Sequence, residues 1–167
     1  CQISVFMDAL RPLIIIDGAH LKGQYLGTMF LAVAMDGNNQ IFPLAFGVGR
    51  SETGESWIWF LERLRECYGS RKGLAIISDR AQSIRLAVRH VFPDAYHGVC
   101  CHHLCMNLRL KKSKSKNNRT LFWRACKAYR VADFEKYMSL LRNSLPKTAK
   151  ILDELGCERW SRAHCPA

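Results

Sequence analysis

The chain has 167 residues and a mass of 19.1 kDa, the size of one compact domain. Hydrophobic residues make up 49% and charged residues 23%, a balance that excludes collagen-like, mucin-like and wholly disordered chains. The 25 Lys and Arg residues outnumber the 14 Asp and Glu residues, which leaves a net charge of +11. Such an excess predicts a polyanionic partner, nucleic acid before a membrane surface.

Strands and helices are expected to alternate over residues 1–99. The pattern predicts a strand at 13–16, a hairpin of 28–35 and 41–48, a helix at 51–67, a strand at 74–77, a helix at 81–92 and a strand at 94–99. The hairpin rests on the turn-rich tetrapeptide Asp-Gly-Asn-Asn at 36–39. The first helix rests on apolar residues that recur every three or four positions from Trp57 to Leu64.

The pattern changes after residue 103. Helical periodicity continues from residue 104 to 155 with no convincing strand, and the basic run 111–119 predicts a solvated loop between helices. Asp133 is a candidate N-cap for a helix at 134–142, and Pro146 is expected to begin the next helix. We therefore predict an α/β core at residues 1–103 and an all-α part at residues 104–167.

Membrane and disulfide classes are not expected. The longest apolar runs, 13–16 and 29–35, fall short of the roughly 18–20 residues of a membrane span. The eight cysteines form no repeated framework, so reduced thiols are the better prediction. Because the chain opens at Cys1 rather than Met, we expect a piece of a longer protein.

Two aspartates follow the two most apolar strands. Asp17 comes directly after 13–16, and Asp79 follows 74–77 through Ser78. Ligand chemistry in α/β sheets gathers at the carboxyl ends of strands, so neighbouring strands would bring both carboxylates into one small volume. Because close carboxylates repel unless a divalent cation neutralises them, this predicts a metal site. The alternative is ordinary turn and capping chemistry, with Asp79 capping the helix at 81, and periodicity does not separate the two.

A dense cluster of soft ligands follows the last predicted strand. It consists of His97, Cys100, Cys101, His102, His103 and Cys105. Zn²⁺ binds Cys and His at such spacings, but a structural zinc site needs a second ligand pair roughly 12–20 residues away. Only Cys126, Cys157, His164 and Cys165 follow, so a complete zinc module is not expected. Cys–His nucleophilic catalysis is a weaker alternative, since such groups are assembled through space and not by local spacing.

Several blocks, taken together, resemble the core of plant Mutator-like (MULE) transposases. The similar stretches are 13–23, 36–46, 55–61, 76–80, 91–100, 103–108 and 158–164, in family order along nearly the whole chain. The resemblance implies an RNase H-like fold, a mixed sheet flanked by helices, with a helical insertion in the C-terminal part. It further implies that Asp17 and Asp79 are the first two acidic residues of a DDE site, and that Cys100 and His103 form the family's Cys-x-x-His motif.

The chemistry implied by this resemblance is cut-and-paste DNA transposition. Asp17 and Asp79 would hold Mg²⁺ or Mn²⁺ in a two-metal site for phosphoryl transfer, and zinc is not expected in this chain. The implied partners are the transposon ends and the target DNA, with a homo-oligomer left open and no membrane. The implied location is the nucleus.

The third acidic residue of the family, a Glu in a Ser-Asn-x-x-Glu-like context, is not found here. The late carboxylates lie in ordinary contexts and none is assigned; they are Asp133, Glu135, Asp153, Glu154 and Glu158. We explain the departure by truncation beyond Ala167 and expect the fragment to bind DNA weakly and to cut it poorly or not at all. The alternative function is a domesticated DNA-binding transcriptional regulator of the far-red-response type. A small RNase H-type nuclease ranks below both, because it does not explain the helical part.

Basic residues are candidates for phosphate contacts. They are Lys22, Arg50 and Arg80 near the expected strand ends, and Lys111, Lys112, Lys114 and Lys116 in the basic run. Each of them singly is also an ordinary solvated charge. Together the excess fits contacts to a nucleic-acid backbone and predicts strongly salt-dependent binding.

Overall fold

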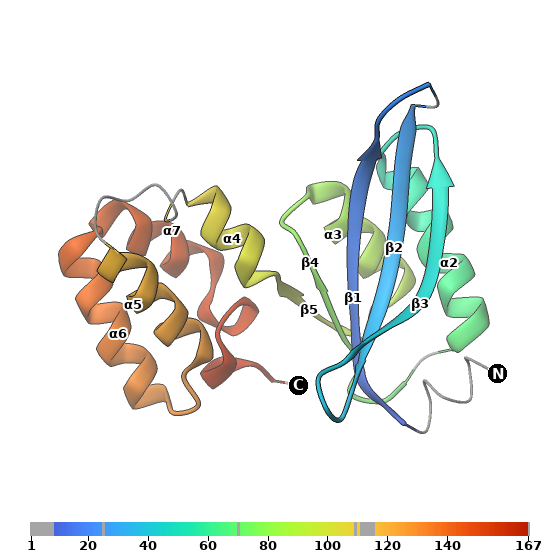
Figure 1. The fold of residues 1–167 in the computed structure, drawn as a ribbon. Coiled ribbons are helices and arrows are strands. Elements are labelled where there is room, and N and C mark those ends of the chain that lie inside the picture. The colour runs from blue at the N-terminus through green and yellow to red at the C-terminus, as the bar shows by residue number, and fades with distance from the viewer. Residues whose placement is uncertain (1–8, 25, 70, 109, 111–115, 167) are drawn as a thin grey trace. The chain divides into compact units, whose positions relative to one another are not determined.

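The computed structural model describes residues 9–24, 26–69, 71–108, 110 and 116–166. Contacts divide the chain into two units, one ending at His97 and the other spanning Gly98–Pro166 (Figure 1). The predicted run at Lys111, Lys112 and Lys114 lies outside the described residues. No helix among the described residues is both long and apolar enough to cross a membrane.

The first unit is built on a five-stranded mixed sheet, whose last strand continues two residues past the unit boundary (Figure 1). Its strands are β1 (Leu10–Leu21), β2 (Gly27–Asp36), β3 (Ile41–Gly49), β4 (Ala75–Ser78) and β5 (Tyr96–Val99), in the order β3-β2-β1-β4-β5. β1, β2 and β3 pair antiparallel, and β4 pairs parallel with β1. A parallel neighbour needs a crossover, which the chain makes through α2 (Gly54–Tyr68). The predicted α/β class with a mixed sheet and flanking helices is confirmed.

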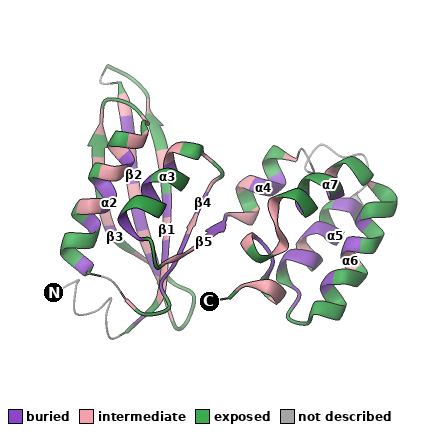
Figure 2. Cartoon of the chain, turned by 180° about the vertical axis from the view of Figure 1, so that it is seen from behind, coloured by how far each residue is buried: buried purple, intermediate pink, exposed green. Residues whose placement is uncertain are grey.

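Helices α2 and α3 (Gln82–Val91) cover one face of this sheet (Figure 2). The core between them centres on Trp57, whose ring meets the Phe30 ring edge-on at a centroid distance of 4.8 Å. Ile16, Ile76 and Ile84 are buried in the same cluster. Alternate residues of a strand point to opposite faces of the sheet, so residues that point into the core, such as Ile16 of β1 and Ile76 of β4, fall at every second position of their strands.

The opposite face of the sheet, which we call the open face, carries the intervening residues. Ile15 and Leu31 are half-buried there, and the side chain of Phe46 is 80% exposed. Leu31 pairs with Asp17 on one side and with Phe46 on the other, so Asp17 belongs to the open face as well. The position of Asp17 thus follows from strand periodicity: Ile16 points into the core and its neighbour points out.

Strand β1 is longer than the sequence predicts. The apolar run ends at Ile16, but β1 continues to Leu21 because β2 stays paired with it as far as the Leu21–Gly27 pair. Asp17 therefore lies inside β1 and not at its tip. The parallel pairing with β4, however, is seen only from Leu13 to Ile15, so Asp17 lies just beyond that contact.

The predicted hairpin is confirmed. The Asp36 side chain closes its turn, because Oδ1 accepts hydrogen bonds from the backbone N–H groups of Asn38 and Gln40, both at 2.8 Å. Asn39 adopts the left-handed conformation with φ of 64°, which asparagine tolerates better than most residues.

Several helix starts differ from the sequence prediction. α5 (Lys116–Lys127) begins within the basic run 111–119, so the prediction of a loop is wrong for residues 116–119. α2 begins at Gly54 and not at residue 51, because the Thr53 hydroxyl accepts the Ser56 N–H at 3.2 Å and caps the helix there. The prediction of Asp133 as an N-cap is wrong, since α6 (Val131–Ser144) begins two residues earlier. Asp133 lies in the first turn instead, where the positive end of the helix dipole stabilises a carboxylate. Pro146 begins α7 (Pro146–Leu155) as predicted.

The second unit consists of helices. They are α4 (Cys101–Asn107), α5 (Lys116–Lys127), α6, α7 and the short 3-10 turns η2 (Cys157–Arg159) and η3 (Arg162–His164). Trp160 organises their core: its ring stacks on Phe122 at 6.0 Å, and its Nε1 donates to the Leu152 carbonyl at 3.2 Å. The first and second units thus have separate hydrophobic clusters.

Candidate functional site

The parallel pair β1–β4 aligns the two predicted aspartates. Ile14 pairs with Ile76 and Ile15 with Ile77, so the register continued by two residues sets Asp17 opposite Asp79. Neighbouring strands lie about 4.8 Å apart, which makes these two residues neighbours along the sheet. Asp17 is exposed and Asp79 half-buried, so both are accessible to solvent. The β1–β4 pairing brings together two segments of the sheet whose following aspartates are 62 positions apart in the chain.

Both aspartates also accept a hydrogen bond from a nearby backbone N–H group. Asp17 Oδ1 accepts the N–H of Gly18 at 3.0 Å, and Asp79 Oδ1 accepts the N–H of Ala81 at 2.8 Å. The second bond lies directly before α3. The N-cap residue of that helix is Ala81, whose side chain has no oxygen that could accept a capping hydrogen bond. One oxygen of Asp79 therefore makes the turn hydrogen bond that the alternative expects, but Asp79 does not cap α3, which has no side-chain cap. A carboxylate accepts at two oxygens, so this bond is compatible with a second interaction at the other.

The end of β4 is held against β5. The Ser78 hydroxyl lies 2.8 Å from His97 Nε2 and donates to the backbone carbonyl of Asp79 at 2.8 Å. Ser78 is fully buried, so this contact supports the backbone directly beneath the Asp79 side chain. His97 is thus a packing partner of β4 in the first unit, although its position in the sequence groups it with the Cys/His cluster.

Glu52 is a residue near this site that the sequence did not single out. Its carboxylate accepts the indole N–H of Trp57 at 3.3 Å and lies 3.9 Å from His20 Nε2. A Cβ placed on Gly18 would lie 3.0 Å from Glu52 Oε1 and 3.3 Å from the Trp57 ring, so a side chain here would press against both residues. Glu52 comes from the loop before α2, and nothing in its local sequence indicates that it reaches β1.

The Cys-x-x-His pair belongs to the second unit. Cys100 is the N-cap residue of α4 and His103 lies in the first turn of that helix. The other thiols of this region serve the core: Cys101 Sγ donates to the Trp160 carbonyl at 3.1 Å, and burial raises the pKa of Cys126. In the described ranges, no three His, Cys, Asp or Glu side chains come close enough together to hold a metal ion.

The late carboxylates have structural partners in the second unit. Arg142 pairs with Asp153 at 2.9 Å and with Glu135 at 3.4 Å, tying α6 to α7. Glu154 lies 3.8 Å from Lys150, one helical turn away. These pairs account for three of the acidic residues by helix packing and surface pairing.

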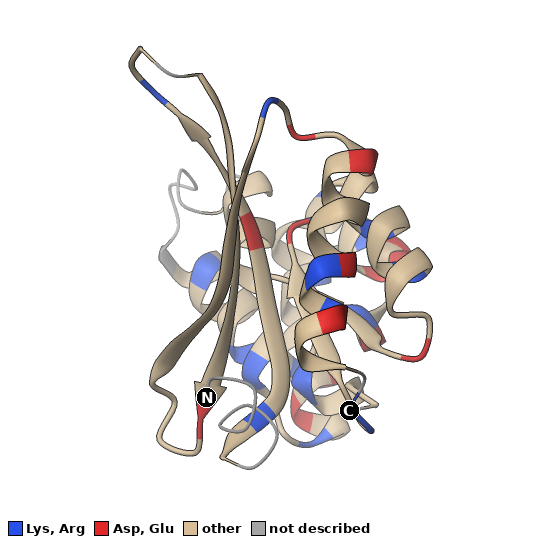
Figure 3. Cartoon of the chain, turned by 90° about the vertical axis from the view of Figure 1, so that its right-hand side faces the viewer, with Lys and Arg blue, Asp and Glu red and all other residues tan. Residues whose placement is uncertain are grey.

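Three predicted basic residues follow strands that run in the same direction. Lys22 follows β1, Arg50 follows β3 and Arg80 follows Asp79 after β4. Because β1, β3 and β4 point the same way, all three residues lie in segments that follow the carboxyl ends of these strands. All three are exposed, and basic residues are visible in loops at the upper end of the long strands in Figure 3. Lys116 begins α5 in the second unit.

Comparison with known proteins identifies one family. The sequence model of the MULE transposase domain matches residues 13–107, more than half of the chain. Among solved structures, a chain of the simian T-cell lymphotropic virus intasome in complex with PP2A regulatory subunit B56 gamma matches with a TM-score of 0.40 and 14% identity. The match covers 68% of this chain and 48% of that chain, so this chain spans about half of its length. No curated protein matches the chain.

Proposed function

The chain belongs to the MULE transposase domain family, and from that premise we propose that it acts on DNA through a divalent metal held by Asp17 and Asp79. The observation that supports the proposal is the β1–β4 register, which, continued by two residues, would set these two residues side by side near the carboxyl end of β4. The substrate in this proposal is a transposon end, the site of action is the nucleus, and the reaction is phosphoryl transfer.

The donor set of the pair suits Mg²⁺ or Mn²⁺. These ions prefer carboxylate oxygens, and Mg²⁺ is commonly held by one or two carboxylates together with waters and substrate phosphates. Two accessible aspartates can therefore hold one such ion together with waters and DNA phosphates, whereas the unassigned third carboxylate is the reason that we expect weak cutting. Bound there, the metal would polarise the phosphoryl group and promote in-line attack.

The surrounding residues have separate tasks in this proposal. Ser78 and His97 hold the backbone of Asp79, so that its carboxylate stays opposite Asp17. Lys22, Arg50 and Arg80 bind phosphates of the DNA backbone. They hold the DNA near the carboxyl ends of the β-strands. Their contribution is electrostatic and independent of sequence, so it weakens as salt concentration rises.

Binding of Mn²⁺, measured by isothermal titration and electron paramagnetic resonance, tests the metal site. The Asp17→Asn and Asp79→Asn variants keep the size and the turn hydrogen bonds but lose a charge, and each should weaken Mn²⁺ binding at least about tenfold. Asp94→Asn is the matched control, because Asp94 is an exposed aspartate of the same unit outside the sheet.

Plasmid nicking should follow metal binding in these proteins. Any Mn²⁺-dependent nicking by the wild type is expected to disappear in Asp17→Asn and Asp79→Asn and to persist in Asp94→Asn. Equal Mn²⁺ affinity in all four proteins would contradict the proposal. If DNA binding is unaffected by EDTA and Mn²⁺ binding is absent, the DNA-binding regulator becomes the better function.

A further inference from the structure

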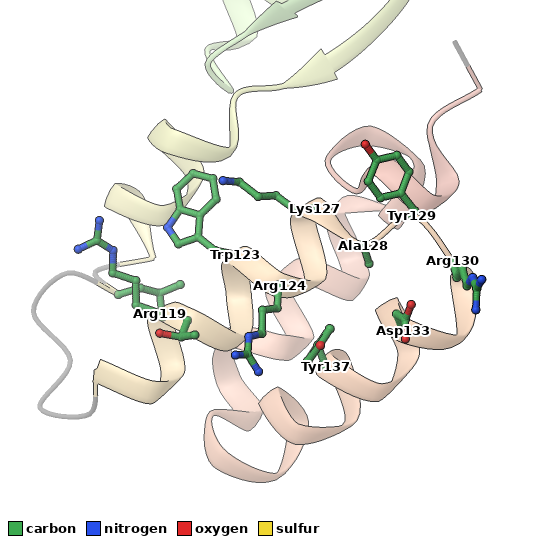
Figure 4. A pocket seen from close by; sticks show the side chains of 11 residues that line it. Arg119, Trp123, Arg124, Lys127, Ala128, Tyr129, Arg130, Asp133 and Tyr137 are labelled. Atoms are coloured by element: carbon green, nitrogen blue, oxygen red, sulfur yellow. The ribbon is translucent and has the colours of Figure 1, made fainter.

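A cavity of about 1060 Å³ lies in the second unit, along α5 and the first turns of α6 (Figure 4). We call it the α5 groove. Arg119, Trp123, Arg124 and Lys127 line it from α5, and Tyr129 and Arg130 come from the connection to α6. These α5 positions recur at intervals of three and four residues and therefore share one face of the helix. The opposite face, with Phe122, Ala125 and Cys126, is buried in the core.

The groove has a strong excess of positive charge. It holds four cations, Arg119, Arg124, Lys127 and Arg130, against one carboxylate, that of Asp133. Within the described part of the chain, none of the four cations makes an ion pair, whereas Arg142 of the same unit has two carboxylate partners. Four cations gathered in one concave surface repel each other, and an anionic ligand would relieve that repulsion.

Aromatic rings alternate with these cations. Trp123 and Tyr137 are half-buried and Tyr129 is 74% exposed. The Lys127 ammonium lies 5.5 Å from the Trp123 ring centroid, and the Arg124 guanidinium lies 5.8 Å from that of Tyr137. Accessible rings with neighbouring cations fit a ligand that carries flat rings and negative charges at short, regular spacing.

From this combination we propose that the α5 groove binds single-stranded DNA, with a base stacked on Trp123 and backbone phosphates on the four cations. Exposed aromatic rings bind bases that are unstacked, and a duplex does not present the faces of its bases. An acidic peptide would satisfy the cations but leave the rings unused. The proposal deepens the DNA-binding part of the proposed function and rests on it, but it uses no carboxylate and no metal.

Fluorescence anisotropy with a labelled oligodeoxythymidine of about 16 nucleotides tests this site. The titrations use the whole chain in EDTA, so that their result is independent of the Asp17–Asp79 pair. Trp123→Ala should weaken binding about tenfold, and Trp123→Phe should restore most of the affinity because it keeps a ring. Trp59→Ala is the matched control, since Trp59 is a 48% exposed tryptophan of the first unit and should leave the affinity unchanged.

The salt dependence tests the cations separately. Four phosphate contacts to a single strand predict a slope of log K against log salt of about −3, and each single change to alanine should reduce its magnitude by about 0.7. Lys147→Ala, an exposed lysine at the start of α7, should leave the slope unchanged. Circular dichroism confirms the fold of each variant.

Three results would overturn the proposal. The first is a Trp123→Ala protein that binds the single strand as tightly as the wild type. The second is an equal loss of affinity for a duplex of the same length, which would show that the ring does not read unstacked bases. The third is displacement of the strand by a polyglutamate of equal charge as effectively as by unlabelled oligonucleotide. Loss of Mn²⁺ binding by the aspartates, with single-strand binding intact, would instead count against the metal site alone.

Discussion

At the scale of single residues, the Tyr68 hydroxyl joins α2 to the sheet. It is buried and donates to the Leu44 carbonyl of β3 at 2.9 Å. Burial, and to a smaller extent the neighbouring Cys67 thiol, raises the pKa of Tyr68 above its ordinary value near 10. Because the protonated form is favoured in the folded state, its contribution to stability is complete below about pH 10 and is lost as the pH rises further.

We expect Tyr68→Phe to lower the free energy of unfolding by about 1–3 kcal/mol at neutral pH, because a buried carbonyl loses its partner. The difference from the wild type should shrink above about pH 10, where the hydroxyl ionises in the unfolded chain before it does in the folded protein. Urea denaturation at a series of pH values measures both effects. Tyr129→Phe, which changes a 74% exposed tyrosine, should have little effect; a constant Tyr68→Phe difference across this pH range would contradict the explanation.

At the scale of elements, helix starts and strand pairs position the site. α2 carries Trp57 into the core and leads back to β4, and its first turn depends on the Thr53 cap. Glu52, the residue directly before that cap, reaches the Trp57 indole and the neighbourhood of Gly18. The start of α2 is therefore connected with the segment of β1 that carries Asp17.

Thr53→Ala should destabilise the protein by about 1 kcal/mol, since it leaves the Ser56 N–H without its cap. Thr53→Asp keeps an oxygen at the same place and should retain most of the stability. Thermal unfolding of the two variants gives the comparison. Equal loss in both would show that the methyl group of Thr53, and not its oxygen, carries the effect.

At the scale of the whole molecule, the chain has two cores with no residue in common. One contains Trp57 and Phe30 between the sheet and its helices, and the other contains Phe134 and Trp160 among α5, α6 and α7. Figure 2 shows buried residues gathered inside each unit. Asp17 and Asp79 belong to the sheet of the first unit, and the α5 groove belongs to the second unit. A substitution that destabilises one core should therefore weaken the proposed activity of that unit and leave the other activity intact.

Phe134→Ala should cost the second unit about 3–5 kcal/mol, the range for a large buried aromatic residue. Hydrogen exchange followed by mass spectrometry should show faster exchange in peptides of residues 116–155 and unchanged exchange in β1 and β4. Ile84→Ala, a matched change in the first core, should give the reverse pattern. Equal acceleration in both units after either change would show that they unfold together.

Local features of the sequence determined much of the fold. Apolar alternation, the Asp-Gly-Asn-Asn turn and helical spacing located the hairpin, α2, α3 and the start of α7, because each depends on residues close in the chain. Asp17 and Asp79 could be singled out in the same way, since each follows an apolar run. The basic excess indicated a polyanionic partner, but not which cations gather in one place.

Only the tertiary structure decided which distant residues meet. The β1–β4 register, the reach of Glu52 to Gly18 and the division of the Cys/His cluster between two units all depend on pairing between remote segments. The α5 groove needs the α5–α6 turn to add Tyr129 and Arg130 to a helix face that by itself looks like ordinary solvated surface. Periodicity in the sequence indicates on which face of a helix or strand a residue lies. Which residues that face contacts is decided by the packing of the elements, which is driven by the burial of their apolar faces.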